Sequence, residues 1–230
     1  MFFHPDDPTT WFPCRRPHMI AHDVGCSRDR STAVVGGLSP LQPELLGIAE
    51  LTELPQGLFG SARASALAAV DRRYSSNALI IADLSYDPTY AEVLYETFGP
   101  RVIGMQISRL GDGTNFERRL VGRSAMLVYT IGHSYLLELF QARLQAGLVR
   151  MSDDPMSRRA CEQLMALETD MREGGAIYKC ASGQHDDLGI SCAMLAWAAG
   201  HPHLEYWFRP AEAARRPRPV APRYSSAGWT

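Results

Sequence analysis

The chain has 230 residues, of which 46% are hydrophobic and 21% charged, and its formal net charge is −2. That length suits one domain with a sizeable core, and no apolar run approaches the ~20 residues that a membrane-spanning helix needs. The N-terminal segment carries acids and prolines where a secretory signal needs a basic and then an apolar region. We therefore expect a cytoplasmic protein with no membrane partner.

The cysteines and basic residues indicate which kinds of binding site the chain could contain. The five cysteines are scattered without a C-x-x-C pair, which argues against a cysteine-rich zinc site. Of the 23 basic residues only Lys179 is a lysine, and arginines suit forked contacts with phosphate groups. The small net charge does not indicate nucleic-acid binding, but it does not exclude it, because an acidic metal site lowers the total while arginines line its rim.

The first part of the chain predicts an antiparallel sheet. Residues 1–17 contain four prolines and no periodic pattern, so an irregular arm is expected there. Short apolar strands are predicted over 18–24, 31–37 and 44–51, with brief polar and proline-containing links between them. Three strands joined by such short links favour an antiparallel meander.

The pattern then changes to alternating helices and strands. Helices are predicted over 57–74 and 86–100, where apolar residues recur at helical spacing. The continuous apolar runs at 78–83 and 101–108 are typical of strands that are buried on both faces. Such alternation implies parallel pairing with right-handed crossovers.

The remainder of the chain is expected to add further elements around this sheet. The segment before Asp186 and Asp187 is polar, whereas the helix that follows is apolar nearly all round and is therefore predicted to be buried. His133 is expected to lie at a helix start. In chain order the predicted elements are a hairpin or excursion over 119–132, a helix over 134–147, a strand over 148–152, a helix over 152–175, a strand over 176–181, the buried helix to about 200, and a flexible basic tail over 209–230.

Four carboxylates fall at the ends of elements that this order brings together. Asp23 closes the first strand, Asp83 closes the fourth, and Asp186 and Asp187 precede the buried helix. Neighbouring carboxylates repel one another, which raises their pKa values unless a cation shares the site, and oxygen ligands in that number suit Mg²⁺ or Mn²⁺. Each aspartate could instead serve a turn or a cap, and we expect one of the last pair to cap its helix. His22, alternating with Asp23, should face the other way.

Three segments carry a resemblance to a known family. They are "HMIAHDVGCSRDRSTAVVGG" with its Asp-x-Gly, "LIIADLSYDPTYAEVLYETFG" with an acid closing the strand, and "GQHDDLGISCAMLAWA" with a His-Asp-Asp-Leu helix start. Together they resemble the nuclease domain of phage terminase large subunits. The resemblance implies an α/β ribonuclease H-like fold over residues 18–208, with a mixed sheet of three antiparallel and then parallel strands and flanking helices. It further implies two Mg²⁺ or Mn²⁺ ions held by Asp23, Asp83 and a third ligand from Asp186 or Asp187, with Asp187 slightly favoured.

The same resemblance implies a function. A terminase nuclease is an endonuclease that cuts concatemeric double-stranded viral DNA during packaging in the bacterial host, by two-metal phosphodiester hydrolysis. The sequence contains no G-x-x-x-x-G-K-[ST] loop, so ATP hydrolysis would belong to a separate packaging ATPase, and a portal or small terminase subunit would be further partners. Candidate DNA contacts are His185 and the arginines of segment 109–123, which could equally be a solvated hairpin: Arg109, Arg118, Arg119 and Arg123.

Other functions stay open on the sequence alone. A Holliday-junction resolvase would share the fold and the acids. A non-catalytic packaging or adaptor protein that keeps the fold is also possible, since "DLSYDPT" lacks the glycines expected after the fourth strand. A sugar-kinase or actin-like ATPase, suggested by "DVGCSRDRSTA", would need a second glycine-rich loop and a much longer chain.

Overall fold

The computed structural model describes most of the chain between residues 18 and 201. In full, the described residues are 2–3, 18–25, 30–39, 42–74, 76–108, 112–172, 175–180, 186–201 and 204. Arg109 and His185, together with nearly all of the predicted arm and the whole predicted tail, lie outside them. Among the helices in these ranges, none is long and apolar enough to cross a membrane.

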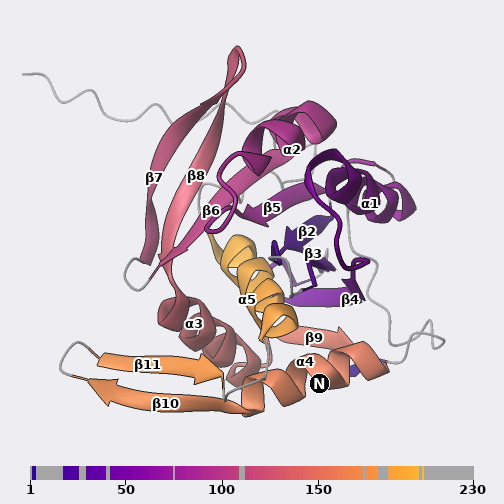
Figure 1. The fold of residues 1–230 in the computed structure, drawn as a ribbon. Coiled ribbons are helices and arrows are strands. Elements are labelled where there is room, and N and C mark those ends of the chain that lie inside the picture. The colour runs from indigo at the N-terminus through magenta and orange to yellow at the C-terminus, as the bar shows by residue number, and fades with distance from the viewer. Residues whose placement is uncertain are drawn as a thin grey trace, which may run out of the picture.

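A nine-stranded mixed sheet forms the centre of the described structure, in the order β1-β9-β4-β3-β2-β5-β6-β8-β7 (Figure 1). Antiparallel pairing joins β2 to β3 and β3 to β4, whereas β5 lies parallel to β2 and β6 parallel to β5. The predicted meander followed by parallel strands is therefore confirmed. The strands are β1 Phe2–Phe3, β2 Met19–His22, β3 Thr32–Leu38, β4 Leu46–Glu53, β5 Leu79–Asp83, β6 Val102–Ser108, β7 Asp112–Val121, β8 Ser124–Gly132 and β9 Val149–Ser152.

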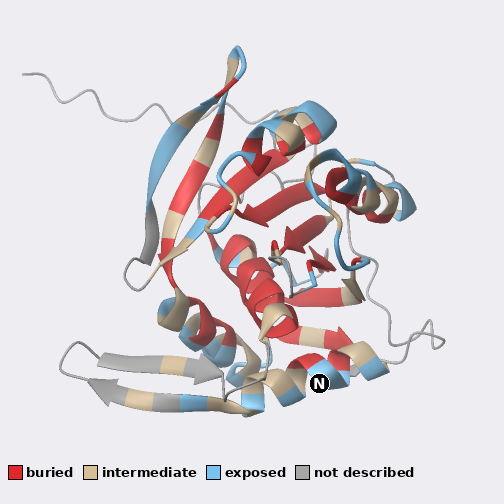
Figure 2. Ribbon diagram, viewed as in Figure 1, coloured by how far each residue is buried: buried red, intermediate tan, exposed pale blue. Residues whose placement is uncertain are grey.

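Helices cover both faces of this sheet (Figure 1). The alternation of side chains along the central strands divides the core in two: Ile20 and Ile80 pack with α1 and α2, while Met19 and Ile81 pack with α3, α4 and α5. Every residue of α5 from 188 to 198 is buried, as its apolar sequence predicted (Figure 2). The helices are α1 Gly60–Arg73, α2 Tyr90–Phe98, the 3₁₀ turn η1 Gly99–Arg101, α3 His133–Gln145, α4 Pro155–Met165 and α5 Asp187–Gly200.

The two edges of the sheet carry additions to this central arrangement. The hairpin of β7 and β8 extends one edge and projects beyond the helices (Figure 1). At the other edge β9 pairs with β4 and with β1, so that Phe2 and Phe3 of the predicted irregular arm form a strand. The helix predicted over 152–175 is wrong in its second half. It ends at Met165, and Leu167–Arg172 forms β10 against β11, Gly175–Cys180, because pairing with the strand-favouring residues of β11 outweighs the local helical pattern.

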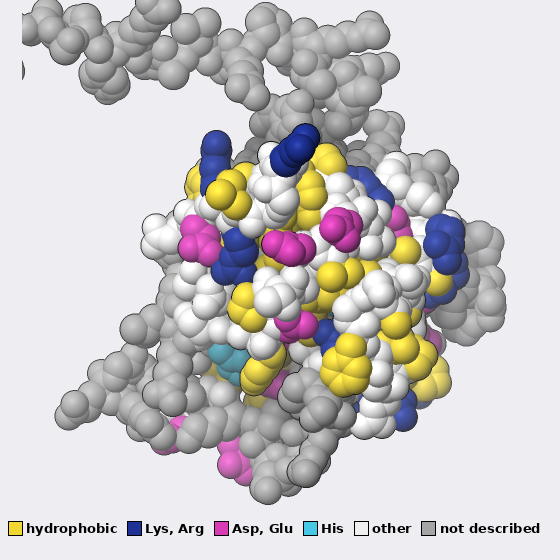
Figure 3. Space-filling view, turned by 45° about the horizontal axis from the view of Figure 1, so that its top comes forward, with side chains coloured by type: hydrophobic (Ala, Val, Ile, Leu, Met, Phe, Trp, Pro, Cys, Tyr) yellow, Lys and Arg dark blue, Asp and Glu magenta, His cyan; other side chains and the backbone are white. Residues whose placement is uncertain are grey.

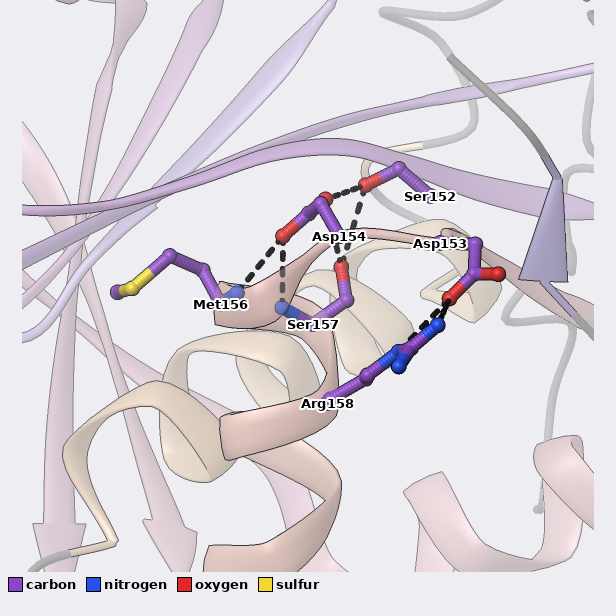
Figure 4. A network of polar contacts seen from close by, with 6 residues as sticks. All are labelled: Ser152, Asp153, Asp154, Met156, Ser157 and Arg158. Atoms are coloured by element: carbon purple, nitrogen blue, oxygen red, sulfur yellow. Dashed lines mark hydrogen bonds and ion pairs between the residues drawn. The ribbon is translucent and has the colours of Figure 1, made fainter.

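A pair of aspartates starts α4. Asp154 is the N-cap: its Oδ1 accepts hydrogen bonds from the backbone N–H groups of Met156 at 2.8 Å and Ser157 at 2.9 Å (Figure 4). Its Oδ2 accepts from the hydroxyl groups of Ser152 and Ser157. The preceding residue, Asp153, forms an ion pair with Arg158 at 2.8 Å. Both carboxylates thus have partners within five residues in sequence, and both serve the helix start.

Candidate functional site

The ends of β2 and β5 place two carboxylates side by side. These strands are parallel with His22 opposite Ala82, so the next residues along the chain, Asp23 and Asp83, lie at the same edge of the sheet. The end of β2 is held by β3, since the N–H of Thr32 donates to the carbonyl oxygen of Asp23 at 3.0 Å. Asp83 is 4% exposed and Asp23 is partly buried.

The first turn of α5 brings the second pair of carboxylates to this edge. Asp186 is the N-cap residue of α5 and Asp187 is its first helical residue. Thr32 makes the connection: its Oγ1 lies 2.6 Å from Oγ of Ser191 and 3.5 Å from the carbonyl oxygen of Asp187. One threonine of β3 therefore contacts both the end of β2 and the start of α5, and fixes the two relative to each other.

The four carboxylates interact electrostatically. Burial raises the pKa of Asp23 well above its usual range, and the neighbouring charges of Asp83, Asp187 and Asp186 raise it further, in that order. Burial also raises the pKa of Asp83, although hydrogen bonds to its carboxylate oppose the change. Repulsion of this kind is relieved when a cation shares the site or when a proton is taken up. The centre is therefore arranged to attract positive charge.

Ser85 orients the carboxylate of Asp83. Oδ1 of Asp83 accepts from the backbone N–H of Ser85 at 2.9 Å and from its hydroxyl group at 2.5 Å. The same hydroxyl oxygen accepts from the N–H of Ile107 at 2.8 Å, which ties the loop after β5 to the end of β6. In the segment "DLSYDPT" a serine therefore fixes the acid by its hydroxyl group, at the place where the sequence analysis expected glycines.

His133 is a site residue that the sequence analysis missed. Its Nε2 lies 3.2 Å from Oδ2 of Asp186, and both side chains are about a quarter exposed (29% and 24%). His133 is the first residue of α3, as predicted for a helix start, and α3 begins where β8 reaches the same edge of the sheet as β5. The only signal in the sequence was a histidine after Gly132 at a strand-to-helix junction, and its partner lies far along the chain.

His22 faces away from this centre, as its alternation with Asp23 predicted. It is fully buried, and its Nδ1–H donates to the carbonyl oxygen of Thr32 at 2.7 Å. Its ring lies edge-on to Tyr90 at the start of α2, on the opposite face from α5. The pKa of His22 is lowered to about 4, chiefly by burial; the backbone hydrogen bond to Thr32 opposes this shift and the positive charge of Arg63 adds to it. This histidine is therefore neutral and structural near pH 7.

Three of the arginines predicted to contact DNA, Arg118, Arg119 and Arg123, lie to the side of the four carboxylates. Arg118 is opposite Leu127 on β8, which is level with Ile81, two residues before Asp83. Because β6 and β8 separate β7 from β5, Arg118 lies roughly 14 Å to the side of β5 at ~4.8 Å per strand. Arg119 lies further toward the hairpin tip and pairs with Glu117 at 2.8 Å, and Arg123 lies in the turn between β7 and β8. Arginines and acids are interspersed on the face drawn in Figure 3. These three arginines thus lie beside the acidic centre, on the hairpin at the edge of the sheet.

The donor chemistry of this centre fits a hard divalent cation. The four carboxylates supply oxygen atoms from three chain segments, which is the ligand type that Mg²⁺ and Mn²⁺ prefer. Within the ranges that the structure describes, no three His, Cys, Asp or Glu side chains already stand in positions that would hold an ion. The acids would therefore have to turn toward a shared ion on binding it, and the contacts of Ser85 with Asp83 and of His133 with Asp186 would oppose this movement.

Comparison with known proteins settles the fold. The sequence matches no protein-family model and no curated protein. The structure is similar to that of the large terminase nuclease from thermophilic phage G20c, with a TM-score of 0.53 at 18% identity over 81% of this chain and 91% of that one. The chain has the fold of a large terminase nuclease. The expected ribonuclease H-like arrangement of sheet and helices is confirmed.

Two further solved structures match at slightly lower similarity. The large terminase nuclease domain of Thermus phage P74-26 has a TM-score of 0.49 at 17% identity, over 80% of this chain and 82% of that one. The corresponding domain of bacteriophage SPP1, solved with bound Mn, has a TM-score of 0.49 at 13% identity, over 79% and 85% of the two chains.

Proposed function

We propose that this chain is a metal-dependent DNA endonuclease of the kind found in terminase large subunits. The observation that carries the proposal is the convergence of Asp23, Asp83, Asp186 and Asp187 at one edge of a terminase-nuclease fold, where their charges raise the pKa of Asp23. Structural aspartates in turns and caps have no need to face one another, because their partners are backbone N–H groups.

The residues divide between ion binding and positioning. Asp23, Asp83 and Asp187 would bind two Mg²⁺ or Mn²⁺ ions, with Asp186 at their margin beside His133. When bound, such a pair of ions activates a water molecule and stabilises the oxygen that leaves the phosphodiester. Ser85 holds one oxygen of Asp83 by two hydrogen bonds and so fixes the orientation in which this carboxylate would bind an ion.

The proposed substrate is double-stranded DNA, and concatemeric viral DNA in particular. Arg118, Arg119 and Arg123 on the β7–β8 hairpin would contact phosphate groups of the duplex beside the cut. Arg109 and His185 are proposed as further phosphate contacts. We propose that the ATPase of packaging is a separate partner, with a portal or a small terminase subunit, in the cytoplasm of a bacterial host.

Plasmid cleavage tests this function. The wild-type chain should cut supercoiled plasmid in Mn²⁺ or Mg²⁺ and not in EDTA, and Asp23→Asn and Asp83→Asn should both abolish cutting. Asp153→Asn, which changes an acid of the α4 start, is the matched control and should cut as the wild type does. Cleavage that persists in EDTA or in both centre variants would falsify the proposal.

The same assay separates the two alternatives. Selective cutting of four-way junctions over linear duplex would assign the chain to the resolvases instead. Intact plasmid under every metal condition, also with a packaging ATPase added, would assign it to the non-catalytic adaptors.

A further inference from the structure

The N-terminus of α5 is capped by a residue from another helix. A helix leaves its first N–H groups without partners, and the residue at the N-cap usually accepts them through its side chain. Asp186 occupies that position in α5 but makes no such hydrogen bond. Oε1 of Gln163, in the last turn of α4, instead accepts from the N–H of Leu188 at 3.2 Å and from that of Gly189 at 3.3 Å. The expected cap is therefore wrong for Asp186.

The start of α4 shows what Asp186 would otherwise do. There the N-cap residue Asp154 accepts from the second and third residues of its helix, Met156 and Ser157 (Figure 4). Leu188 and Gly189 hold the equivalent positions in α5. Asparagine and aspartate are among the strongest N-cap residues, so Asp186 would take these two hydrogen bonds if they were open to it. Gln163 takes them instead.

Close packing of the two helices delivers Gln163 to this place. A Cβ atom at position 189 would lie 2.8 Å from Cδ2 and 2.9 Å from Cγ of Leu164, closer than real contacts allow. The glycine thus lets the last turn of α4 approach the first turn of α5, and Gln163, next to Leu164, reaches the N–H groups. The arrangement depends on this close approach of the two helices.

We propose that Gln163 is a positioning residue that releases Asp186 from capping. With its helix capped from outside, the carboxylate of Asp186 stays directed to His133 and within the electrostatic reach of Asp23. The consequence for metal binding rests on the proposed function, whereas the exchange of caps does not. A neutral amide also satisfies the helix without adding another negative charge beside four carboxylates.

A double-mutant cycle on the metal-free chain tests the exchange of caps by thermal unfolding. Gln163→Met replaces the amide by a side chain of similar size that lacks its acceptor oxygen. Asp186 should then turn back to cap α5, so the melting temperature should fall little. Asp186→Ala should not lower it, because Asp186 caps nothing. The double variant has no cap and should melt about 2–4 °C below the sum of the single effects. With Asp186 already alanine, Gln163→Glu keeps an acceptor at this position and should melt well above the Gln163→Met double variant. Additive single effects would overturn the proposal.

Binding of Mn²⁺, followed by calorimetry or electron paramagnetic resonance, tests the consequence. Gln163→Met should weaken Mn²⁺ binding about tenfold, because it withdraws Asp186 from the centre, and it should have no effect when Asp186 is already alanine. Equal weakening in both backgrounds would mean that Gln163 acts only through general stability, against the proposal. If the wild-type chain binds no Mn²⁺, the proposed function fails, while the cycle of melting temperatures still decides whether Gln163 replaces Asp186 as the cap.

Discussion

The chain contains two helices that begin with consecutive aspartates, and it uses the two pairs in opposite ways. At α4, Asp154 caps the helix and Asp153 pairs with Arg158 (Figure 4). At α5, Asp186 contacts His133 and its charge, like that of Asp187, acts on Asp23. The first pair finds its partners within five residues, whereas the described contacts of the second pair reach distant segments. The acidic pair at α4 thus serves the helix start, whereas the charges of the pair at α5 act on another acid of the centre.

The difference is set by what surrounds each helix start. Serines at 152 and 157 and the N–H groups of the first turn surround Asp154 with donors. The start of α5 instead receives its acceptor from Gln163, and Thr32 fixes its backbone against β3. The charges of the α5 pair therefore act on Asp23 and raise its pKa, and such mutual perturbation of acids is typical of functional centres.

The substitution Asp187→Asn is expected to have the largest effect, and that effect is a loss of DNA cleavage. Asp187 acts on Asp23 more strongly than Asp186 does, and Thr32 contacts its carbonyl oxygen, so it is the better candidate for a direct ligand. We expect a loss of about 10³-fold in single-turnover plasmid cutting, since losing a ligand should exceed the ten- to hundredfold cost of losing a group that only orients one. Asp153→Asn should retain wild-type cutting. Equal losses in the two variants would erase the distinction between the pairs.

The pH dependence of stability should separate His22 from the acids that follow it. In the folded chain the pKa of His22 is lowered to about 4, against 6.5 in the unfolded chain. The unfolded state therefore takes up the proton first, and stability is lost as the pH falls from about 6.5 through 4, by about 2.5 kcal/mol at pH 4.5. The raised pKa of Asp23 acts in the opposite direction, because protonation relieves repulsion that is fully present above that pKa.

Urea unfolding at pH 7.5 and pH 4.5 measures this contribution when His22→Asn is run beside the wild type. Asparagine keeps a donor toward the carbonyl oxygen of Thr32 but does not titrate. The variant should lose about 2.5 kcal/mol less than the wild type on acidification. Parallel losses would assign the acid sensitivity to other groups.

The next largest effect is on the free energy of unfolding. Substitution in the α4 pair should lower it, whereas substitution in the α5 pair should not. Asp154→Ala removes an acceptor of two backbone and two hydroxyl hydrogen bonds, and should lower the free energy of unfolding by about 2 kcal/mol. Asp186→Ala removes no cap and relieves repulsion on Asp23, so it should not destabilise the chain. Chemical denaturation at pH 7.5 gives both values, and a comparable loss in Asp186→Ala would mean that its carboxylate supports the fold.

The sequence was sufficient to predict the parts of the site that depend on strand order. Asp23 and Asp83 each end an apolar run, and the meander followed by alternating elements implied that their strands are parallel neighbours, as β2 and β5 are. His22 was placed on the opposite face by the period of two along a strand. These predictions used only local patterns and the rules by which strands pair.

The missed features depend on contacts between segments far apart in the chain. Gln163 is 25 residues from Leu188, and its function as a cap follows from how closely α4 packs on α5. His133 was recognised as a helix start, but its partner Asp186 lies 53 residues away. The end of α4 was mistaken for the same reason, because pairing of β10 with β11 decides it and the local sequence does not.

The smallest effects are expected from substituting the side chains that contact the two aspartate pairs, His133 at α5 and Arg158 at α4. His133→Ala should lower plasmid cutting about tenfold at saturating Mn²⁺, because Asp186 loses the side chain that orients it. Its effect on stability should stay within about 0.5 kcal/mol, since a partly exposed pair contributes little. Arg158→Ala removes the equivalent partner of Asp153, on an exposed surface, and should leave cutting unchanged. Reduced cutting in both variants would show that either helix start influences the centre, whereas a loss confined to His133→Ala would assign that influence to α5 alone.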